Sequence, residues 1–275
     1  MKLASYATPV ERVFYWGTWI FTAAVLLFLI APILVIMPLS FNAEPYFTYP
    51  MPGLSLQWYQ DFFMGDRWMP ALWVSVKIAV AVTILSTILG TLAALGLSRT
   101  NLPLRSLMLG TLISPMIVPV IISAVAMYFF YARLGMIGWI SGIILAHTVL
   151  ATPFVVVTVT STLAGFDWTL ARAGTSLGAS PFTVFRKIIM PLILPGMISG
   201  ALFAFVTSFD EVVVALFLAD PETRTLPKQM FSGIREQISP TITAAATVLI
   251  IFSTLMLVGA ELMRRRSERL RGITR

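Results

Sequence analysis

The chain has 275 residues, of which 58% are hydrophobic and only 11% are charged. A soluble domain carries about 25% charged residues, so this composition excludes an ordinary soluble protein and indicates an integral membrane protein. The net charge of +7 comes from cations that are scattered over the ends of apolar runs instead of gathered on one face, which argues against nucleic-acid binding.

Six long apolar runs follow one another along the chain. They lie at residues 13–40, 71–98, 106–131, 139–164, 191–219 and 241–263. A membrane-spanning helix needs about 20 mostly apolar residues, whereas the strands of a membrane barrel read as alternations of about 10 residues. The first run far exceeds the core of a signal peptide and no small-residue cleavage site follows it, so we expect a retained span. We therefore predict an all-α, polytopic membrane protein in which residues 1–275 form one domain with six transmembrane helices.

The Lys and Arg residues are distributed unequally between the two sides of the membrane. If the amino terminus is inside, most of the 19 cations fall on the inner side, together with the carboxyl terminus. Because cytoplasmic segments carry the excess of Lys and Arg, we predict that both termini and the long segment 165–190 are cytoplasmic. The connections 41–70 and 220–240 then lie outside.

Small residues recur every four positions in the fifth run, at Gly196, Gly200, Ala204 and Ser208. Small residues at this spacing allow two helices to approach closely in lipid. Helix packing is the expected use of this face. Lining of a translocation path is the alternative, and opposite faces of one helix can serve both.

The long inner segment carries signals for two short helices. Asp167 or Thr169 can accept hydrogen bonds from the free N–H groups at the start of the first helix. Gly178 is suited to the left-handed position that ends it. Ser180 and Pro181 then provide a cap and a first-turn proline for the second helix. Without further information, such helices can simply lie on lipid headgroups.

This segment also carries a family likeness in LARAGTSLGASPFTVFRKIIMP. It resembles the cytoplasmic loop motif of permease subunits of bacterial ABC importers, which reads Glu-Ala-Ala, three residues, Gly, nine residues, Ile, one residue, Leu, Pro. The matching positions are Arg172, Ala173, Gly174, Gly178, Ile188, Met190 and Pro191. The spacing is intact, while Arg172, Gly174 and Met190 depart from the residue types of the motif.

The likeness extends over most of the chain, including LQWY in the first outer loop and SFDEVVVALF after the motif, and is greatest to the spermidine/putrescine permeases. It implies the type I importer fold and a bacterial inner-membrane location. It further implies that the segment 165–190 is a coupling segment, seated in a groove of a separate ATPase subunit. The coupling residues implied in this way are Arg172, Ala173, Gly174, Leu177, Gly178, Ser180, Pro181, Ile188 and Pro191.

The same resemblance implies the partners of the chain. ATP and Mg²⁺ are expected in the partner ATPase and no cofactor in this chain, in keeping with the lack of a G-x-x-x-x-G-K-[ST] motif. A second homologous permease, forming a heterodimer, and an extracytoplasmic solute-binding protein complete the expected assembly within the lipid bilayer.

Ionisable residues inside the predicted spans provide the strongest chemical signal. Intramembrane carboxylates are costly and usually face a cavity or a partner, and hydroxyl groups one helical turn away lie beside them. The candidates for a solute path are Asp210, Glu211, Ser208, Thr207, Lys77, His147 and Tyr128. Alternatives stand beside them: Lys77 can snorkel to headgroups or pair with the acids, His147 can be a buried structural residue, and Tyr128 can anchor the interface.

Several functions compete for this pattern. Two carboxylates facing a path favour a cationic solute, and a polyamine agrees with the family likeness. The third run reads SPMIVPVIIS without the acid that polyamine permeases carry there, so an opine or amino-acid derivative is the alternative solute. A stand-alone channel or secondary transporter is the alternative class. With one His and no Cys, the chain lacks the nucleophile–base pair or metal cluster that an intramembrane enzyme needs, so we expect no enzymatic activity.

Overall fold

The computed structural model describes residues 8–98, 102–236 and 239–270. The two ends of the chain, which the orientation prediction places in the cytoplasm, lie outside these residues. The helices of the first half are α1 (Pro9–Leu39), α2 (Gln57–Met64), α3 (Trp68–Leu97), α4 (Arg105–Ile117), α5 (Val120–Leu134) and α6 (Ile140–Ala164). Those of the second half are α7 (Trp168–Ser176), α8 (Pro181–Val184), α9 (Met190–Phe209), α10 (Val213–Leu218), α11 (Leu226–Glu236) and α12 (Pro240–Leu270). The all-α prediction is confirmed over this described part.

The long helices are those that the apolar runs predict. Four stretches are long and apolar enough to cross a membrane: α1, α3, α6 and the continuous stretch Pro181–Phe209. A fifth is present if α4 and α5, which meet at 101°, count as one span, while the apolar part of α12, Pro240–Met256, is shorter within the described residues. The count of six spans, the single domain and the cytoplasmic termini therefore stay predictions.

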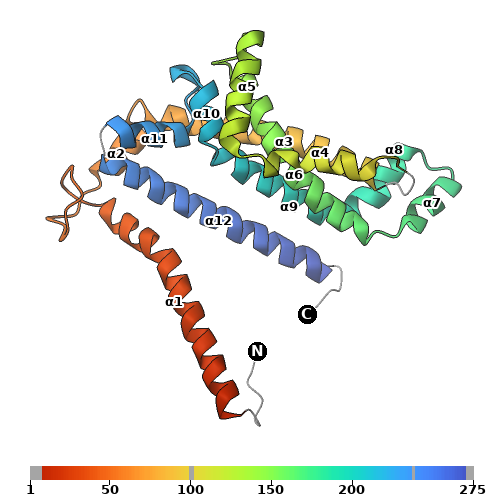
Figure 1. Ribbon diagram of the computed structural model, residues 1–275, viewed down its shortest axis with the longest axis horizontal. Coiled ribbons are helices and arrows are strands. Elements are labelled where there is room, and N and C mark those ends of the chain that lie inside the picture. The colour runs from red at the N-terminus through yellow and green to blue at the C-terminus, as the bar shows by residue number, and fades with distance from the viewer. Residues whose placement is uncertain (1–7, 99–101, 237–238, 271–275) are drawn as a thin grey trace.

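Helices α3, α6 and α9 form the centre of the body (Figure 1). The small-residue face of α9 makes this packing possible. A Cβ atom added to Gly200 would lie 2.9 Å from the Cα atom of Val155 in α6, and one added to Gly196 would lie 2.2 Å from the hydroxyl of Thr162. The packing use of this face is thus confirmed, because α9 approaches α6 at a distance that only glycine allows.

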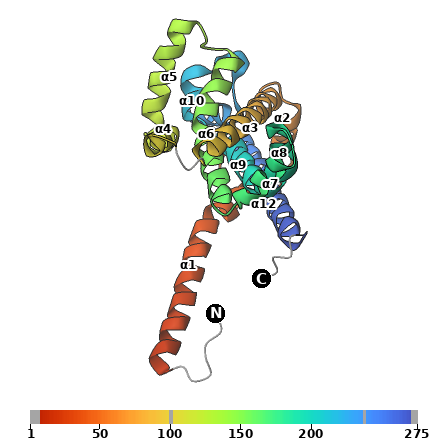
Figure 2. The same ribbon diagram turned by 90° about the vertical axis from the view of Figure 1, so that its right-hand side faces the viewer.

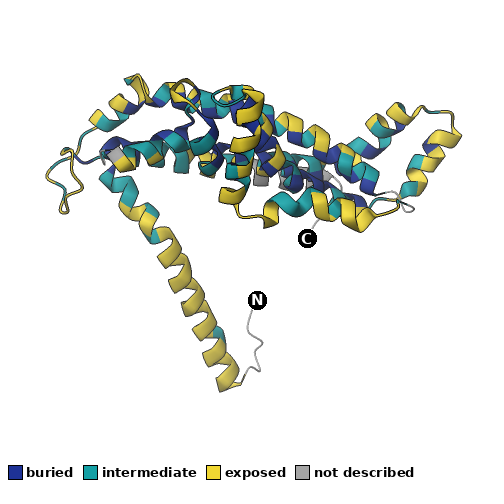
Figure 3. Cartoon of the chain, turned by 45° about the horizontal axis from the view of Figure 1, so that its top comes forward, coloured by how far each residue is buried: buried dark blue, intermediate teal, exposed yellow. Residues whose placement is uncertain are grey.

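Helix α1 leaves the body and projects away from it, as the two perpendicular views show (Figures 1 and 2). None of its residues is buried, and Figure 3 shows its surface as exposed along almost the whole length. It is joined to the body at its carboxyl end, where the Ser40 hydroxyl lies 2.7 Å from the Tyr59 hydroxyl. The helices α7 and α8 lie at one end of the body, and α2 and α11 at the other (Figure 1).

The third apolar run is divided, in contrast to the continuous span predicted over 106–131. Helix α4 ends at Ile117 and α5 begins at Val120. Val118 is extended, with ψ at 131°, because the proline that follows it disfavours helical geometry at the preceding residue. Pro119 also has no N–H to continue the helical ladder. The result is the 101° bend between the two helices.

The fifth run is divided as well, and here a side chain is responsible. The prediction was one span over 191–219, but α9 ends at Phe209 and α10 begins only at Val213. The carboxylate of Glu211 accepts hydrogen bonds from the N–H groups of Val213 and Val214, at 3.0 and 2.8 Å. These N–H groups bond the side chain instead of the carbonyls one turn earlier, so the ladder is interrupted.

Candidate functional site

The segment 165–190 has the caps that its sequence predicts. Asp167 accepts a hydrogen bond of 2.9 Å from the Thr169 N–H at the start of α7, and hydrogen bonds from Thr169 lower the pKa of the Asp167 carboxyl. After α7 the chain turns at Gly178, whose φ of +83° lies in the left-handed region that disfavours other residues. Ser180 caps α8 by accepting from the Thr183 N–H at 3.3 Å. The conformational predictions for Asp167, Gly178 and Ser180 are confirmed.

The second short helix differs from the prediction, because it does not end before Pro191. Helix α8 continues through a π-helical stretch, Phe185–Ile189, into α9. The N–H of Met190 bonds the carbonyl of Phe185, five residues back instead of four. Since Pro191 has no N–H to donate, we attribute this local widening to the accommodation of the proline inside a continuous helix. The segment 165–190 is therefore connected to α9 by continuous helix.

The motif residues fall into an inward and an outward set. Gly174 is buried, and a Cβ atom there would lie 2.6 Å from Cδ1 of Ile188, so the end of that side chain would have to shift. Leu177 is 88% exposed and Phe182 is 69% exposed. Phe182 is outside the spacing of the motif, so sequence reasoning did not select it. The segment thus presents two apolar side chains on a hairpin that Gly174 and Ile188 hold together.

The remaining coupling candidates lie along the same hairpin. Arg172 and Ala173 belong to α7, whereas Pro181 begins α8 and Pro191 lies in the first turn of α9. Arg172 is exposed, and its guanidinium contributes to the lowered pKa of the Asp167 carboxyl. The departure from Glu at this position of the motif therefore places a cation on the outer surface of α7.

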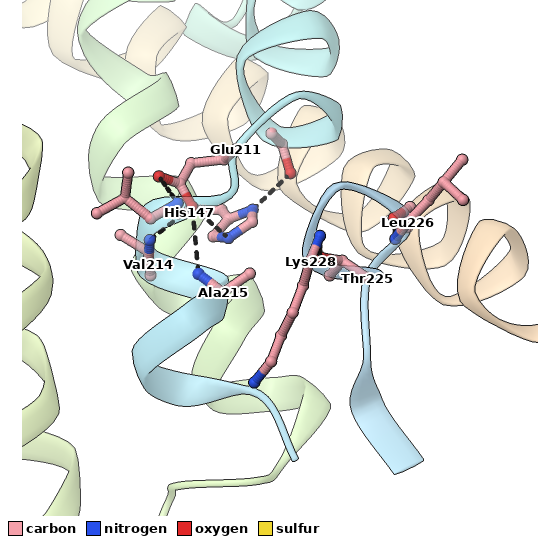
Figure 4. Close-up of polar contacts among 10 residues, drawn as sticks. His147, Glu211, Val214, Ala215, Thr225, Leu226 and Lys228 are labelled. Atoms are coloured by element: carbon pink, nitrogen blue, oxygen red, sulfur yellow. Dashed lines mark hydrogen bonds and ion pairs between the residues drawn. The ribbon is translucent and has the colours of Figure 1, made fainter. Parts of the chain in front are cut away.

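A polar cluster lies at the break between α9 and α10 (Figure 4). His147 of α6 is 1% exposed, and its Nδ1 atom lies 3.0 Å from the Ser208 hydroxyl. Its Nε2 atom lies 3.7 Å from a carboxylate oxygen of Glu211, whose side chain is 8% exposed. The third N–H bonded by Glu211 is that of Ala215, at 3.3 Å. The Glu211 charge is thereby neutralised in part by three backbone dipoles.

The other candidates for a solute path are not drawn into this cluster. Lys77 is exposed on α3, and no ion pair joins it to an acid among the described residues, so the structural pairing considered from sequence is absent there. Tyr128 contacts the edge of the Phe217 ring, with centroids 6.3 Å apart. Thr207 is half-buried, while Asp210 ends α9 and is exposed. Of the candidates for a solute path, the structure thus brings together His147, Ser208 and Glu211, with Asp210 next to Glu211 in the chain.

The two adjacent acids have different surroundings. On a continuous helix they would point about 100° apart, but the break separates them more completely. Glu211 folds back onto the start of α10, whereas no hydrogen bond or ion pair to the Asp210 carboxylate is found within the described part of the chain. Within those same residues no group of three or more His, Cys, Asp or Glu is placed to hold a metal ion. Asp210 is thus the member of the pair that remains available to another molecule.

Several membrane-length helices in one chain define a polytopic membrane protein. Residues 86–271 match the family described as binding-protein-dependent transport system inner membrane component. The chain belongs to this family, since the match covers more than half of it. It is accordingly a permease component of an ABC importer in the inner membrane, and ATP hydrolysis belongs to a separate subunit.

Curated relatives and solved structures agree with this assignment. The spermidine/putrescine transport system permease protein PotC of Haemophilus influenzae is 34% identical over 90% of this chain and 96% of its own length. The putrescine transport system permease protein PotI of Escherichia coli is 35% identical over 81% of this chain and 82% of its own. A bacterial ABC transporter involved in the import of alginate shares the fold, with a TM-score of 0.72 and 14% identity over 95% of this chain and 99% of that chain.

Proposed function

We propose that this chain forms half of the membrane path for a polyamine, beside a second homologous permease, in an importer driven by ATP. A solute-binding protein delivers the polyamine from outside. An ATPase subunit contacts the coupling segment 165–190 from the cytoplasm. The observation that carries the solute assignment is the exposed carboxylate of Asp210, for which the described residues provide no hydrogen bond or ion pair.

Charge is the physical reason for a cationic solute. A carboxylate inside a membrane protein is retained at a cost of a few kcal/mol, so it is expected to meet a cation or a polar cavity. The Glu211 carboxylate has polar partners within the protein, namely the N–H groups of Val213, Val214 and Ala215. The Asp210 carboxylate has no such partner among the described residues, and a protonated amine that passes the break between α9 and α10 would supply one. The relatives named for spermidine and putrescine transport support the same class of solute.

Coupling follows from the continuity of the hairpin with α9. Leu177 and Phe182 offer apolar surface to a groove of the ATPase, as anchors of protein interfaces do. Because α8 continues into α9 without a hinge residue outside the π-helical stretch, a displacement of the hairpin is passed along α9. Helix α9 ends at Phe209, next to Asp210. Closure of the ATPase would thus move the end of α9 that carries the acid.

The test uses the complete transporter, with the second permease, the ATPase and the binding protein, in liposomes. Asp210→Asn should lower ATP-driven uptake of radiolabelled spermidine by on the order of tenfold, the effect of losing one charge-assisted contact. The assembly should still copurify. Glu222→Gln removes an exposed carboxylate from the outer surface and serves as the matched control.

Two results would oppose the proposal. Equal spermidine uptake by Asp210→Asn and the unsubstituted transporter at all concentrations would remove the acid from the path. Uptake of a zwitterionic amino-acid derivative in preference to spermidine would favour the alternative solute. The need for the second permease and the ATPase is tested with the isolated chain in liposomes, because spermidine uptake by this chain alone, without ATP, would contradict both.

A further inference from the structure

The short helix α10 is held at its amino end by an acid. Three of its N–H groups, those of Val213, Val214 and Ala215, donate to the carboxylate of Glu211 at 2.8 to 3.3 Å. The first N–H groups of any helix lack partners within the helix and favour a negative charge. Glu211 therefore satisfies the amino end of α10 and at the same time fixes the chain between α9 and α10.

The carbonyl end of α10 is held by a cation from another helix. The Lys228 amino group, on α11, donates to the carbonyls of Ala219 and Leu216, the latter at 3.5 Å. The last carbonyls of a helix lack internal partners in the same way and favour a positive charge. Figure 4 shows the Lys228 side chain extending from its own helix toward the end of α10, on the side away from Glu211. A helix of six residues is thus clamped by opposite charges at its two ends.

Lys228 itself is anchored to the body of the protein. Helix α11 begins at Leu226, whose N–H donates to the Ser75 hydroxyl of α3 at 2.8 Å. The Lys228 N–H donates to the Thr225 hydroxyl at 3.4 Å. Burial lowers the pKa of the Lys228 amine, with nearby Arg224 acting in the same direction, so the amino group sits in a partly desolvated place. Its bonds to carbonyls therefore connect α10 to α3 through α11.

We propose that Lys228 is a positioning residue for the solute path: by holding the carbonyl end of α10, it fixes the break at 210–212 and hence the direction of the Asp210 carboxylate. The inference rests on the proposed role of Asp210 in solute transport. Lys228 does not bind solute itself, because an ammonium group has only donors and would repel a cationic solute. Because Glu211 holds one end of α10 and Lys228 holds the other, neither end of this helix can move independently of the body.

The test measures the local order of the break directly. The chain contains no Cys, so Val212→Cys gives it a single thiol. This thiol lies between Glu211 and α10, and both acids are kept. The complete transporter is labelled with a membrane-impermeant thiol reagent. Lys228→Met should raise the labelling rate at this position by on the order of tenfold, as expected when hydrogen bonds to a charged group are lost. Lys228→Arg keeps a cationic donor and should restore the original rate.

Two controls separate a local effect from general destabilisation. Arg235→Met removes a cation from the exposed last turn of the same helix and should leave the rate unchanged. Glu44→Cys, on the exposed outer loop, should be labelled equally in all backgrounds. If Lys228→Met does not assemble, Lys228→Gln replaces it, since the amide lacks the charge and the length to reach both carbonyls.

The outcomes distinguish this inference from the function on which it rests. Equal labelling in Lys228→Met, Lys228→Arg and Arg235→Met would overturn the positioning role, whatever the uptake of solute. Faster labelling in Lys228→Met, together with unchanged spermidine uptake by Asp210→Asn, would support the positioning of α10 and reject the role of Asp210. Faster labelling that Lys228→Arg reverses, with uptake lost in Asp210→Asn, is the expected result.

Discussion

The close packing of α9 on α6 provides the sharpest prediction about stability. Gly200→Ala adds one Cβ atom that would lie 2.6 Å from the Thr158 hydroxyl and 2.9 Å from the Cα atom of Val155. Because the second contact is with backbone, the two helices must separate to accommodate it. Overpacking of this kind costs about 1–3 kcal/mol, whereas the higher helix propensity of alanine returns about 1 kcal/mol. The substitution should therefore be destabilising on balance.

Gly110→Ala in α4 is the matched control, because an added Cβ there has nothing within 4 Å. The gain in helix propensity is common to both variants, so the difference between them isolates the overpacking cost of about 1–3 kcal/mol. The assay is thermal unfolding of the purified permease chain in detergent. The Gly200→Ala variant should melt several degrees below the Gly110→Ala variant, since ~1 kcal/mol shifts Tm by about 2–4 °C in a protein of comparable size. A melting temperature equal to or above that of the control would refute the close approach of α9 and α6.

Two further predictions concern the coupling segment. Leu177→Asp should weaken copurification of the ATPase by on the order of tenfold or more, as for an apolar interface anchor. It should not lower the melting temperature of the isolated permease, because Leu177 is 88% exposed. Unchanged copurification would contradict the place of Leu177 in the interface. The lowered pKa of Asp167 means that its cap stabilises α7 above the unfolded pKa of about 3.9 and that this stability is lost as pH falls through the still lower folded pKa. Hydrogen exchange of the first-turn amides of α7, corrected for intrinsic rates, should accelerate at such acidic pH, and Asp167→Ala should remove this pH dependence.

The predictions from sequence succeeded where the signal is local. The apolar runs predict helices because only helices and closed barrels satisfy backbone groups in lipid, and the runs are too long for the strands of a barrel. The caps at Asp167 and Ser180 and the left-handed turn at Gly178 were predictable, since each depends on a side chain or a glycine within three residues of the helix end. The loop motif likewise depends on spacing along one segment.

The breaks in the helices were harder to predict from the sequence. Both Val118 and Glu211 interrupt runs that were predicted to be continuous helices. Pro119 offered a local signal for the first break, although proline is tolerated inside membrane helices. The second break depends on hydrogen bonds from the N–H groups of Val213 and Val214 to the Glu211 carboxylate. The sequence alone does not predict it, because the same residues are equally compatible with a continuous helix.

The amino-acid sequence by itself determined the class of protein, the apolar helices and the ends of the coupling hairpin, because these follow from composition and from interactions between near neighbours in the chain. Only the tertiary structure decided that Glu211 is bonded within the protein whereas Asp210 remains exposed. It brought His147 of α6 to Ser208 and Glu211 and placed Lys228 of α11 at the far end of α10. These partners are distant along the chain, and their contacts depend on how α6, α9, α10 and α11 are arranged in space.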